Sequence, residues 1–161
     1  MLKLSSHMNI LDEAFNKPYP YKLVKVSSDE YVSEFKADDG TFIKVMFAGS
    51  EHMDDYDEYD WEITFNRMGK SGKPSMEITG EGDAMRIFAT VMKVIEEFIK
   101  KENPKYMNLS AEKKTQGGDK NVLQSREKLY KRMLKKYLGS KYKIDHRTAR
   151  FGSVFYLERK K

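Results

Sequence analysis

Two glycines in the middle of the chain, Gly80 and Gly82, have the spacing of an anion-binding loop. The short segment before them, Met76 to Thr79, is apolar and β-branched, and a helix-like pattern follows. A strand, a glycine turn and a helix in this order leave backbone N–H groups free at the helix N-terminus, where proteins hold phosphate and other anions. The alternative is a tight turn without a ligand, because glycines at this spacing also occur in purely structural turns.

The helix behind these glycines is predicted from its apolar periodicity. Asp83 stands at the N-cap position, and Asn103-Pro104 ends the pattern. Between them, apolar residues recur at the i, i+3, i+4 spacing of a helix with one buried face. These residues are Ile87, Phe88, Val91, Met92, Val94, Ile95, Phe98 and Ile99.

Two charged side chains elsewhere are candidates for chemistry or binding. Glu62 lies on the polar face of an alternating strand, where its carboxylate is either a general base for an amine or an ordinary exposed charge. Arg126 lies on the apolar stripe of a second helix, and a partly buried guanidinium requires an anionic partner. That partner is either a bound anion or a carboxylate of the chain, Glu77 or Asp83.

The composition excludes several classes of protein. With 161 residues, 39% hydrophobic and 12% aromatic, the chain is expected to fold as one domain with a real core. The absence of cysteine excludes disulfides, thiolate metal sites and cysteine nucleophiles, and fits a reducing cytoplasm. His7, His52 and His146 are far apart, so no metal is expected. No apolar run reaches the ~18 residues of a membrane span. Residues 1–7 resemble an expression scar, which leaves 8–161 as the expected domain.

Charge is distributed unevenly along the chain. Residues 1–99 hold 19 Asp and Glu against 11 Lys and Arg, a balance of −8, whereas residues 100–161 hold 6 against 19, a balance of +13. Such polarity suggests an anionic ligand or partner near the C-terminal half, and exposed helix lysines are the alternative. The basic half could bind nucleic acid by stacking, unless its aromatic residues are core. These residues are Tyr130, Tyr137, Tyr142, Phe151 and Phe155.

In contrast to the basic C-terminal half, the segment from Asp54 to Asp60 is a run of acidic residues. It could bind a divalent cation or mimic the charge of nucleic acid. It lacks the glycine-punctuated spacing of a calcium loop, and a solvated loop is the simpler interpretation.

The predicted elements form an α+β fold with a single mixed, mostly antiparallel sheet and two main helices. Asp38-Asp39-Gly40 indicates a hairpin, and Gly139 is the predicted stop of the second helix, Val122 to Leu138. The strand after the first helix should run parallel to a neighbour, because a helix and a break precede it. The predicted strands are Tyr21–Val26, Tyr31–Lys36, Thr41–Phe47, Asp60–Arg67, Lys105–Ser110, Lys141–Asp145 and Ser153–Glu158.

This order of elements resembles that of the GCN5-related N-acetyltransferases, the GNAT fold. In that family a Q/R-x-x-G-x-G/A loop cradles the pyrophosphate of acetyl-CoA, and Glu77 to Gly82 (EITGEG) matches both glycines. The resemblance implies an acetyl-CoA site formed by Thr79, Gly80, Glu81, Gly82, Asp83 and Ala84, with Arg126 as an anion-binding side chain. Leu129 to Met133 (LYKRM) is similar to the start of the family's LYEKLGF phrase. Tyr130 would then be the general acid for the departing CoA thiolate, and its alternative is a core tyrosine.

The sequence departs from the family pattern in ways that oppose catalysis. Glu77 replaces the leading Gln or Arg, and Glu81 and Asp83 place carboxylates where phosphates should be attracted. Two helices that normally form part of the acceptor site have no room between Val26 and Tyr31.

A second resemblance concerns two short phrases, TGEGDAMRIFATV and SREKLY, which are similar to a group of small tailed-phage proteins of unassigned function. Two functions are therefore open. One is a GNAT-like, phage-encoded protein without catalysis, which binds a host protein or nucleic acid in the host cytoplasm. The other is an acetyl-CoA-dependent N-acyltransferase acting on a protein or a small amine.

Overall fold

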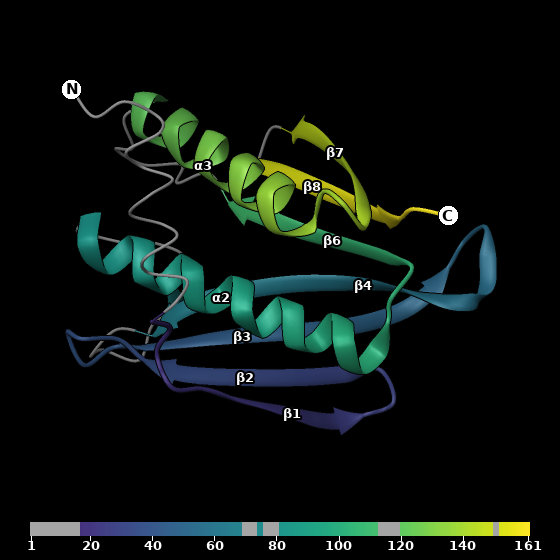
Figure 1. The fold of residues 1–161 in the computed structure, drawn as a ribbon, viewed down its shortest axis with the longest axis horizontal. Coiled ribbons are helices and arrows are strands. Elements are labelled where there is room, and N and C mark those ends of the chain that lie inside the picture. The colour runs from purple at the N-terminus through teal and green to yellow at the C-terminus, as the bar shows by residue number, and fades with distance from the viewer. Residues whose placement is uncertain (1–16, 69–73, 76–80, 113–119, 150–151) are drawn as a thin grey trace. The chain divides into compact units, whose positions relative to one another are not determined.

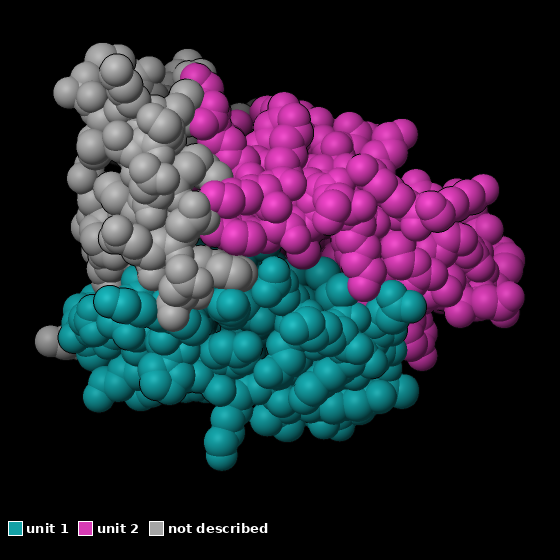
Figure 2. All heavy atoms as spheres, viewed as in Figure 1, with its two compact units in different colours: residues 1–46, 65–103 teal, residues 47–64, 104–161 magenta. Residues whose placement is uncertain are grey.

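The structure is a computed structural model, and it describes residues 17–68, 74–75, 81–112, 120–149 and 152–161. The chain forms two compact units (Figure 2). Unit 1 consists of residues 1–46 and 65–103, and unit 2 consists of residues 47–64 and 104–161. The predicted scar, residues 1–7, lies outside the described residues, and the prediction of one domain over residues 8–161 stays a prediction.

The described elements follow the predicted order (Figure 1). The helices are α2 (Glu81–Glu102) and α3 (Lys120–Leu138). The strands are β1 (Lys22–Ser27), β2 (Glu30–Lys36), β3 (Phe42–His52), β4 (Asp55–Met68), β5 (Pro74–Ser75), β6 (Tyr106–Glu112), β7 (Tyr142–Ala149) and β8 (Gly152–Arg159).

The strands belong to one mixed sheet in the order β1-β2-β3-β4-β6-β8-β7, and β5 pairs with β4. The predicted α+β fold with one mostly antiparallel sheet and two helices is confirmed for the described part of the chain. The parallel pairing predicted for the strand after the first helix is also confirmed, since β6 runs parallel to β4. This ladder joins Asp60 through Ile63 to Tyr106 through Leu109, and both strands continue beyond it.

Unit 1 packs α2 on one face of its strands. The predicted apolar stripe of the helix is buried, with exposures from 0% to 5%. It meets aromatic side chains of the sheet edge-on, Phe98 against Tyr31 at 5.1 Å and Phe88 against Phe65 at 6.2 Å between ring centroids. Burial of apolar area contributes roughly 25 cal/mol per Å², so this layer stabilises unit 1.

Unit 2 repeats the arrangement of one helix on one sheet face. The side chains buried on this face alternate along β4, β6 and β8, as a sheet covered on one side requires. They are Trp61, Ile63, Met107, Leu109, Phe155 and Leu157, and the buried residues of α3 are Tyr130, Met133, Leu134 and Leu138. Ser153, buried on the same face, donates a hydrogen bond to Glu127 of α3. The helix therefore covers the face that carries Phe155 and Leu157.

Local signals placed the turns correctly. Gly40 has φ +85°, and its N–H donates to the carbonyl of Ala37 within the predicted hairpin turn. Asn103 ends α2 with φ 49°, a left-handed conformation that asparagine tolerates, and Pro104 follows it. Gly139 ends α3 as predicted, and a Cβ there would lie 2.3 Å from the carbonyl oxygen of Lys135.

Two boundary predictions are wrong. Helix α2 begins at Glu81, so Asp83 lies in the first turn and not at the N-cap. The helix extends through Gly82. Glycine in a helix costs only about 1 kcal/mol relative to alanine, which a helix of this length tolerates. The acidic run from Asp54 to Asp60 is largely strand and not loop, because β4 begins at Asp55 and forms a long hairpin with β3.

Candidate functional site

Most of the residues predicted to hold acetyl-CoA have side chains outside the described part of the structure. Thr79 and Gly80 lie outside the described residues, as does Glu77. Glu81, Gly82, Asp83 and Ala84 form the first turn of α2, described as backbone only. Arg126 belongs to α3, and its side chain is also outside the described part. The cofactor site therefore stays a prediction.

The two predicted catalytic residues occupy opposite faces of the unit 2 sheet. Tyr130 is 6% exposed on α3, the helix that covers the buried face. Glu62 is an exposed residue of β4 between the buried side chains of Trp61 and Ile63, so it points to the other face. The structure does not bring these two side chains together.

The face that carries Glu62 is a regular array of polar and aromatic side chains, here called the open face of unit 2. Residues that pair directly across strands share a face, so the registers define its rows. The first row reads Lys143, Glu158, Tyr106 and Asp60 across β7, β8, β6 and β4. The second row reads Asp145, Tyr156, Asn108 and Glu62 across the same strands.

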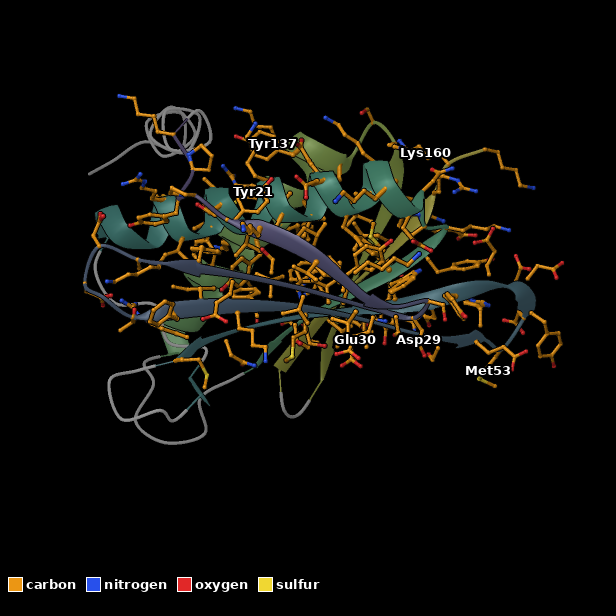
Figure 3. All side chains as sticks on the ribbon, turned by 90° about the horizontal axis from the view of Figure 1, so that it is seen from below. Tyr21, Asp29, Glu30, Met53, Tyr137 and Lys160 are labelled. Atoms are coloured by element: carbon orange, nitrogen blue, oxygen red, sulfur yellow. The ribbon has the colours of Figure 1, made fainter. Side chains whose placement is uncertain are left out.

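A groove of about 430 Å³ crosses this open face. His52 and Asp54 from the end of the β3–β4 hairpin line it, together with side chains of both rows. Met53, between these two residues, is 86% exposed at the hairpin end (Figure 3). We call this depression the open-face groove.

Aromatic rings are central to the open-face groove. The rings of His52 and Tyr106 stack at 3.7 Å between centroids with an interplanar angle of 15°. Tyr156 is 41% exposed, and the guanidinium carbon of Arg147 lies 5.2 Å from its ring centroid. The two tyrosines stand on the neighbouring strands β6 and β8 in adjacent rows. Such rings can stack on planar groups or accept a cation on their faces.

Carboxylates surround the rings. Asp60 accepts a hydrogen bond from the side-chain amide of Asn108 at 3.2 Å. Beside the groove, Lys105 donates to Asp55 at 2.9 Å. This hydrogen bond is the main reason that the pKa of Asp55 is lowered and that of Lys105 raised. The acidic start of β4 is thus fixed by a lysine fifty residues further along the chain.

The aromatic residues predicted for nucleic-acid stacking are mainly core residues. Tyr130, Tyr142 and Phe155 are buried, and Phe151 lies outside the described residues. Sequence reasoning missed the two tyrosine rings of the groove, Tyr156, which is exposed, and Tyr106, which is half-buried and stacked on His52. Their signal was the alternation in YMNLS and VFYLE, which sets each tyrosine opposite to its apolar neighbours.

Comparison with protein-family models and with curated protein sequences finds no match for this chain. Within the described ranges, no group of three or more His, Asp or Glu side chains is placed to hold a metal ion. No helix in those ranges is long and apolar enough to span a membrane.

Proposed function

We propose that this chain is a GNAT-like protein that binds a partner protein and does not transfer an acyl group. The observation that supports this proposal is the placement of Tyr130 and Glu62 on opposite faces of the unit 2 sheet. In acetyl transfer, the base that takes the proton of the amine and the acid that protonates the thiolate must reach the same reacting atoms. Tyr130, buried on the face that α3 covers, and Glu62, exposed on the open face, do not meet this requirement.

The same face that carries Glu62 offers a surface suited to binding. Exposed tyrosine rings combine apolar area with a polar end, and they are enriched in protein interfaces for this reason. The open-face groove has one such exposed ring, Tyr156 on β8, beside the half-buried ring of Tyr106 on β6. The resemblance to small tailed-phage proteins makes a host protein in the host cytoplasm the proposed partner.

An acetyl-CoA-dependent N-acyltransferase is the second candidate, and one feature of the sheet is compatible with it. The parallel ladder between β4 and β6 ends at Ile63 and Leu109, although β4 continues to Met68 and β6 to Glu112. A short parallel pair is compatible with the GNAT order of elements. In this alternative, Glu62 is not the base, and the acceptor is a protein or a small amine.

Calorimetric titration of acetyl-CoA and CoA distinguishes the two candidates. We expect no detectable heat of binding at millimolar ligand in moderate salt. The informative variant is Gly82→Arg, which adds a bulky side chain in the predicted phosphate loop, and Glu30→Arg on β2 is the control for an added arginine. Micromolar affinity that is lost in Gly82→Arg and kept in Glu30→Arg would contradict the proposal and make the acyltransferase the leading function.

A further inference from the structure

We infer that the open-face groove binds a cationic side chain, a lysine or an arginine, carried by an extended basic segment of a partner protein. The inference rests on the proposed function as a binding protein and adds the chemistry of the partner.

The charge of the groove favours a cation. Four carboxylates line it, those of Asp54, Asp60, Asp145 and Glu158, against two cationic side chains, Lys143 and Arg147. Both cations belong to β7, the outermost strand of the unit 2 sheet, whereas the carboxylates also come from β8, β4 and the hairpin. Glu62 in the second row adds a further exposed carboxylate beside Asn108. The part of the groove away from β7 is therefore acidic and attracts a positively charged group.

The exposed ring of Tyr156 adds a second reason for a cation. Ring faces attract ammonium and guanidinium groups within about 6 Å of the centroid. Tyr156 already has a guanidinium of its own chain over its ring, that of Arg147 at 5.2 Å. Arg147 also lies 3.8 Å from Asp145, and the side chains of this pair are 73% and 62% exposed. Ion pairs this exposed contribute little to stability, so a cation from a partner can take the place of Arg147.

Nucleic acid does not fit this surface. Stacking on Tyr106 and Tyr156 would bring phosphates next to Asp60, Glu62 and Glu158, and like charges repel. Four lysines that could attract phosphates, Lys128, Lys131, Lys135 and Lys136, belong to α3, the helix that covers the opposite face of the unit 2 sheet. The exposed ring of Tyr156 and this basic helix surface are thus separated by the sheet itself.

An extended peptide is favoured over a free small amine. Each contact in an exposed groove contributes only about 0.2–1 kcal/mol, so one ammonium group alone would bind weakly. Several contacts along one chain add up, because the first limits the freedom of the others. The rows of the open face offer successive carboxylates and rings to residues of such a segment.

The test is an NMR titration of the ¹⁵N-labelled protein with a blocked octapeptide in which arginine alternates with serine. The matched probe has citrulline in place of arginine, which keeps the shape and removes the charge. We expect shift changes at Tyr106, Asn108 and Tyr156, and an affinity for the citrulline peptide about tenfold lower. Equal affinity for the two peptides, or shift changes outside the groove alone, would overturn the inference.

Variants test the groove residues directly. Asp54→Asn combined with Glu158→Gln, and separately Tyr156→Ala, should each weaken the arginine peptide about fivefold or more at low salt. Asp29→Asn combined with Glu30→Gln, at two exposed positions of unit 1, is the charge-matched control for the double variant and should leave the affinity unchanged. An equal loss of affinity in the two groove variants and in the control would show nonspecific electrostatics and contradict the inference. So would a single-stranded oligonucleotide that binds the protein and loses affinity in Tyr156→Ala.

Failure of this inference and failure of the proposed function are separate results. Acetyl-CoA binding is measured without the peptide and depends on Gly82, so a positive result there overturns the proposed function and leaves the peptide data unaffected. Absence of peptide binding, with absence of acetyl-CoA binding, would remove the basic partner and keep the non-catalytic assignment.

Discussion

The hydroxyl of Tyr31 donates a hydrogen bond of 2.6 Å to Glu102, and this contact joins β2 to the last residue of α2. Burial first, and then the bond to Glu102, raise the pKa of Tyr31 from 10.0 to about 12. The folded-state pKa is above the unfolded value, so neutral Tyr31 stabilises the fold fully below pH 10.0 and this stabilisation is lost as the pH rises toward 12.

We therefore expect Tyr31→Phe to lose about 1 kcal/mol of unfolding free energy at neutral pH, because the carboxylate of Glu102 loses its donor. The variant should also lose less stability than the parent between pH 9 and pH 11. Urea unfolding followed by circular dichroism at several pH values measures both effects. Parallel pH curves for the parent and Tyr31→Phe would contradict this role of the hydroxyl.

Asp39 fixes the turn between β2 and β3 through Thr41 and Arg67. The Thr41 hydroxyl donates to Asp39 at 2.6 Å and accepts from Nε of Arg67 at 2.9 Å, and Arg67 also forms an ion pair with Asp39. The hydrogen bond from the Thr41 hydroxyl is the main cause of the lowered pKa of Asp39. This carboxylate therefore stabilises the fold above its unfolded pKa of 3.8, and the effect is lost as the pH falls through its lower folded value.

Thr41→Val should lower the unfolding free energy by about 1–2 kcal/mol at pH 7, since two hydrogen bonds are lost beside a buried arginine. Its acid-induced loss of stability should be smaller than that of the parent. Thr148→Val on β7, an exposed threonine, is the matched control and should stay within about 0.5 kcal/mol. Equal effects of the two substitutions would show that the turn network contributes nothing.

Ser33 and Ser153 form a natural comparison, because both are 1% exposed on strands. The hydroxyl of Ser33 is buried and has no hydrogen-bond partner among the described residues, whereas that of Ser153 donates to Glu127. Ser33→Ala should leave the unfolding free energy unchanged or raise it by up to about 1 kcal/mol. Ser153→Ala should lower it by about 1–3 kcal/mol, because a charged acceptor loses its donor. Thermal and urea unfolding measure the two free energies. A loss in Ser33→Ala that equals or exceeds the loss in Ser153→Ala would contradict the prediction.

Gly49 lies against Trp61, the single tryptophan of the chain. A Cβ at Gly49 would stand 3.2 Å from the indole ring, and Trp61 is only 2% exposed. Gly49→Ala should therefore cost about 1 kcal/mol and Gly49→Val about 2–3 kcal/mol, with a change in tryptophan fluorescence. Gly40→Ala, where the added atom meets nothing within 4 Å, should cost about 1 kcal/mol through its positive φ alone and leave the fluorescence unchanged.

The order of elements was predictable because its signals are local. The apolar stripe of α2 and the glycine at position 40 each depend on a few neighbouring residues. The extension of β3 and β4 was not predictable in this way, because residues 48–60 have little apolar alternation. Contacts with the start of β6 and the residue before it hold this part of the hairpin: His52 stacks on Tyr106, and Asp55 pairs with Lys105. Such contacts join residues about fifty positions apart, which no short window contains.

The candidate site was harder to predict than the fold. Alternation shows that Tyr156 and Phe155 face opposite ways, but it does not show which of the two faces a helix covers. That choice depends on the packing of α3, expressed in contacts such as Ser153 to Glu127. The short phrase LYKRM indicates Tyr130 as a candidate acid, whereas its burial follows from the packing of α3. The open-face groove also requires the register between four strands, which is a tertiary property.

The interleaving of the two units has a consequence for synthesis on the ribosome. Every segment of unit 1 has been translated once Asn103 is made, so this unit can fold early. Residues 47–64 belong to unit 2, and their neighbour β6 and the further strands β8 and β7 are made later. The long acidic hairpin therefore gains its neighbouring strand β6 only after more than forty further residues of chain have emerged. Its dense negative charge helps to keep this waiting segment soluble and apart from other nascent chains.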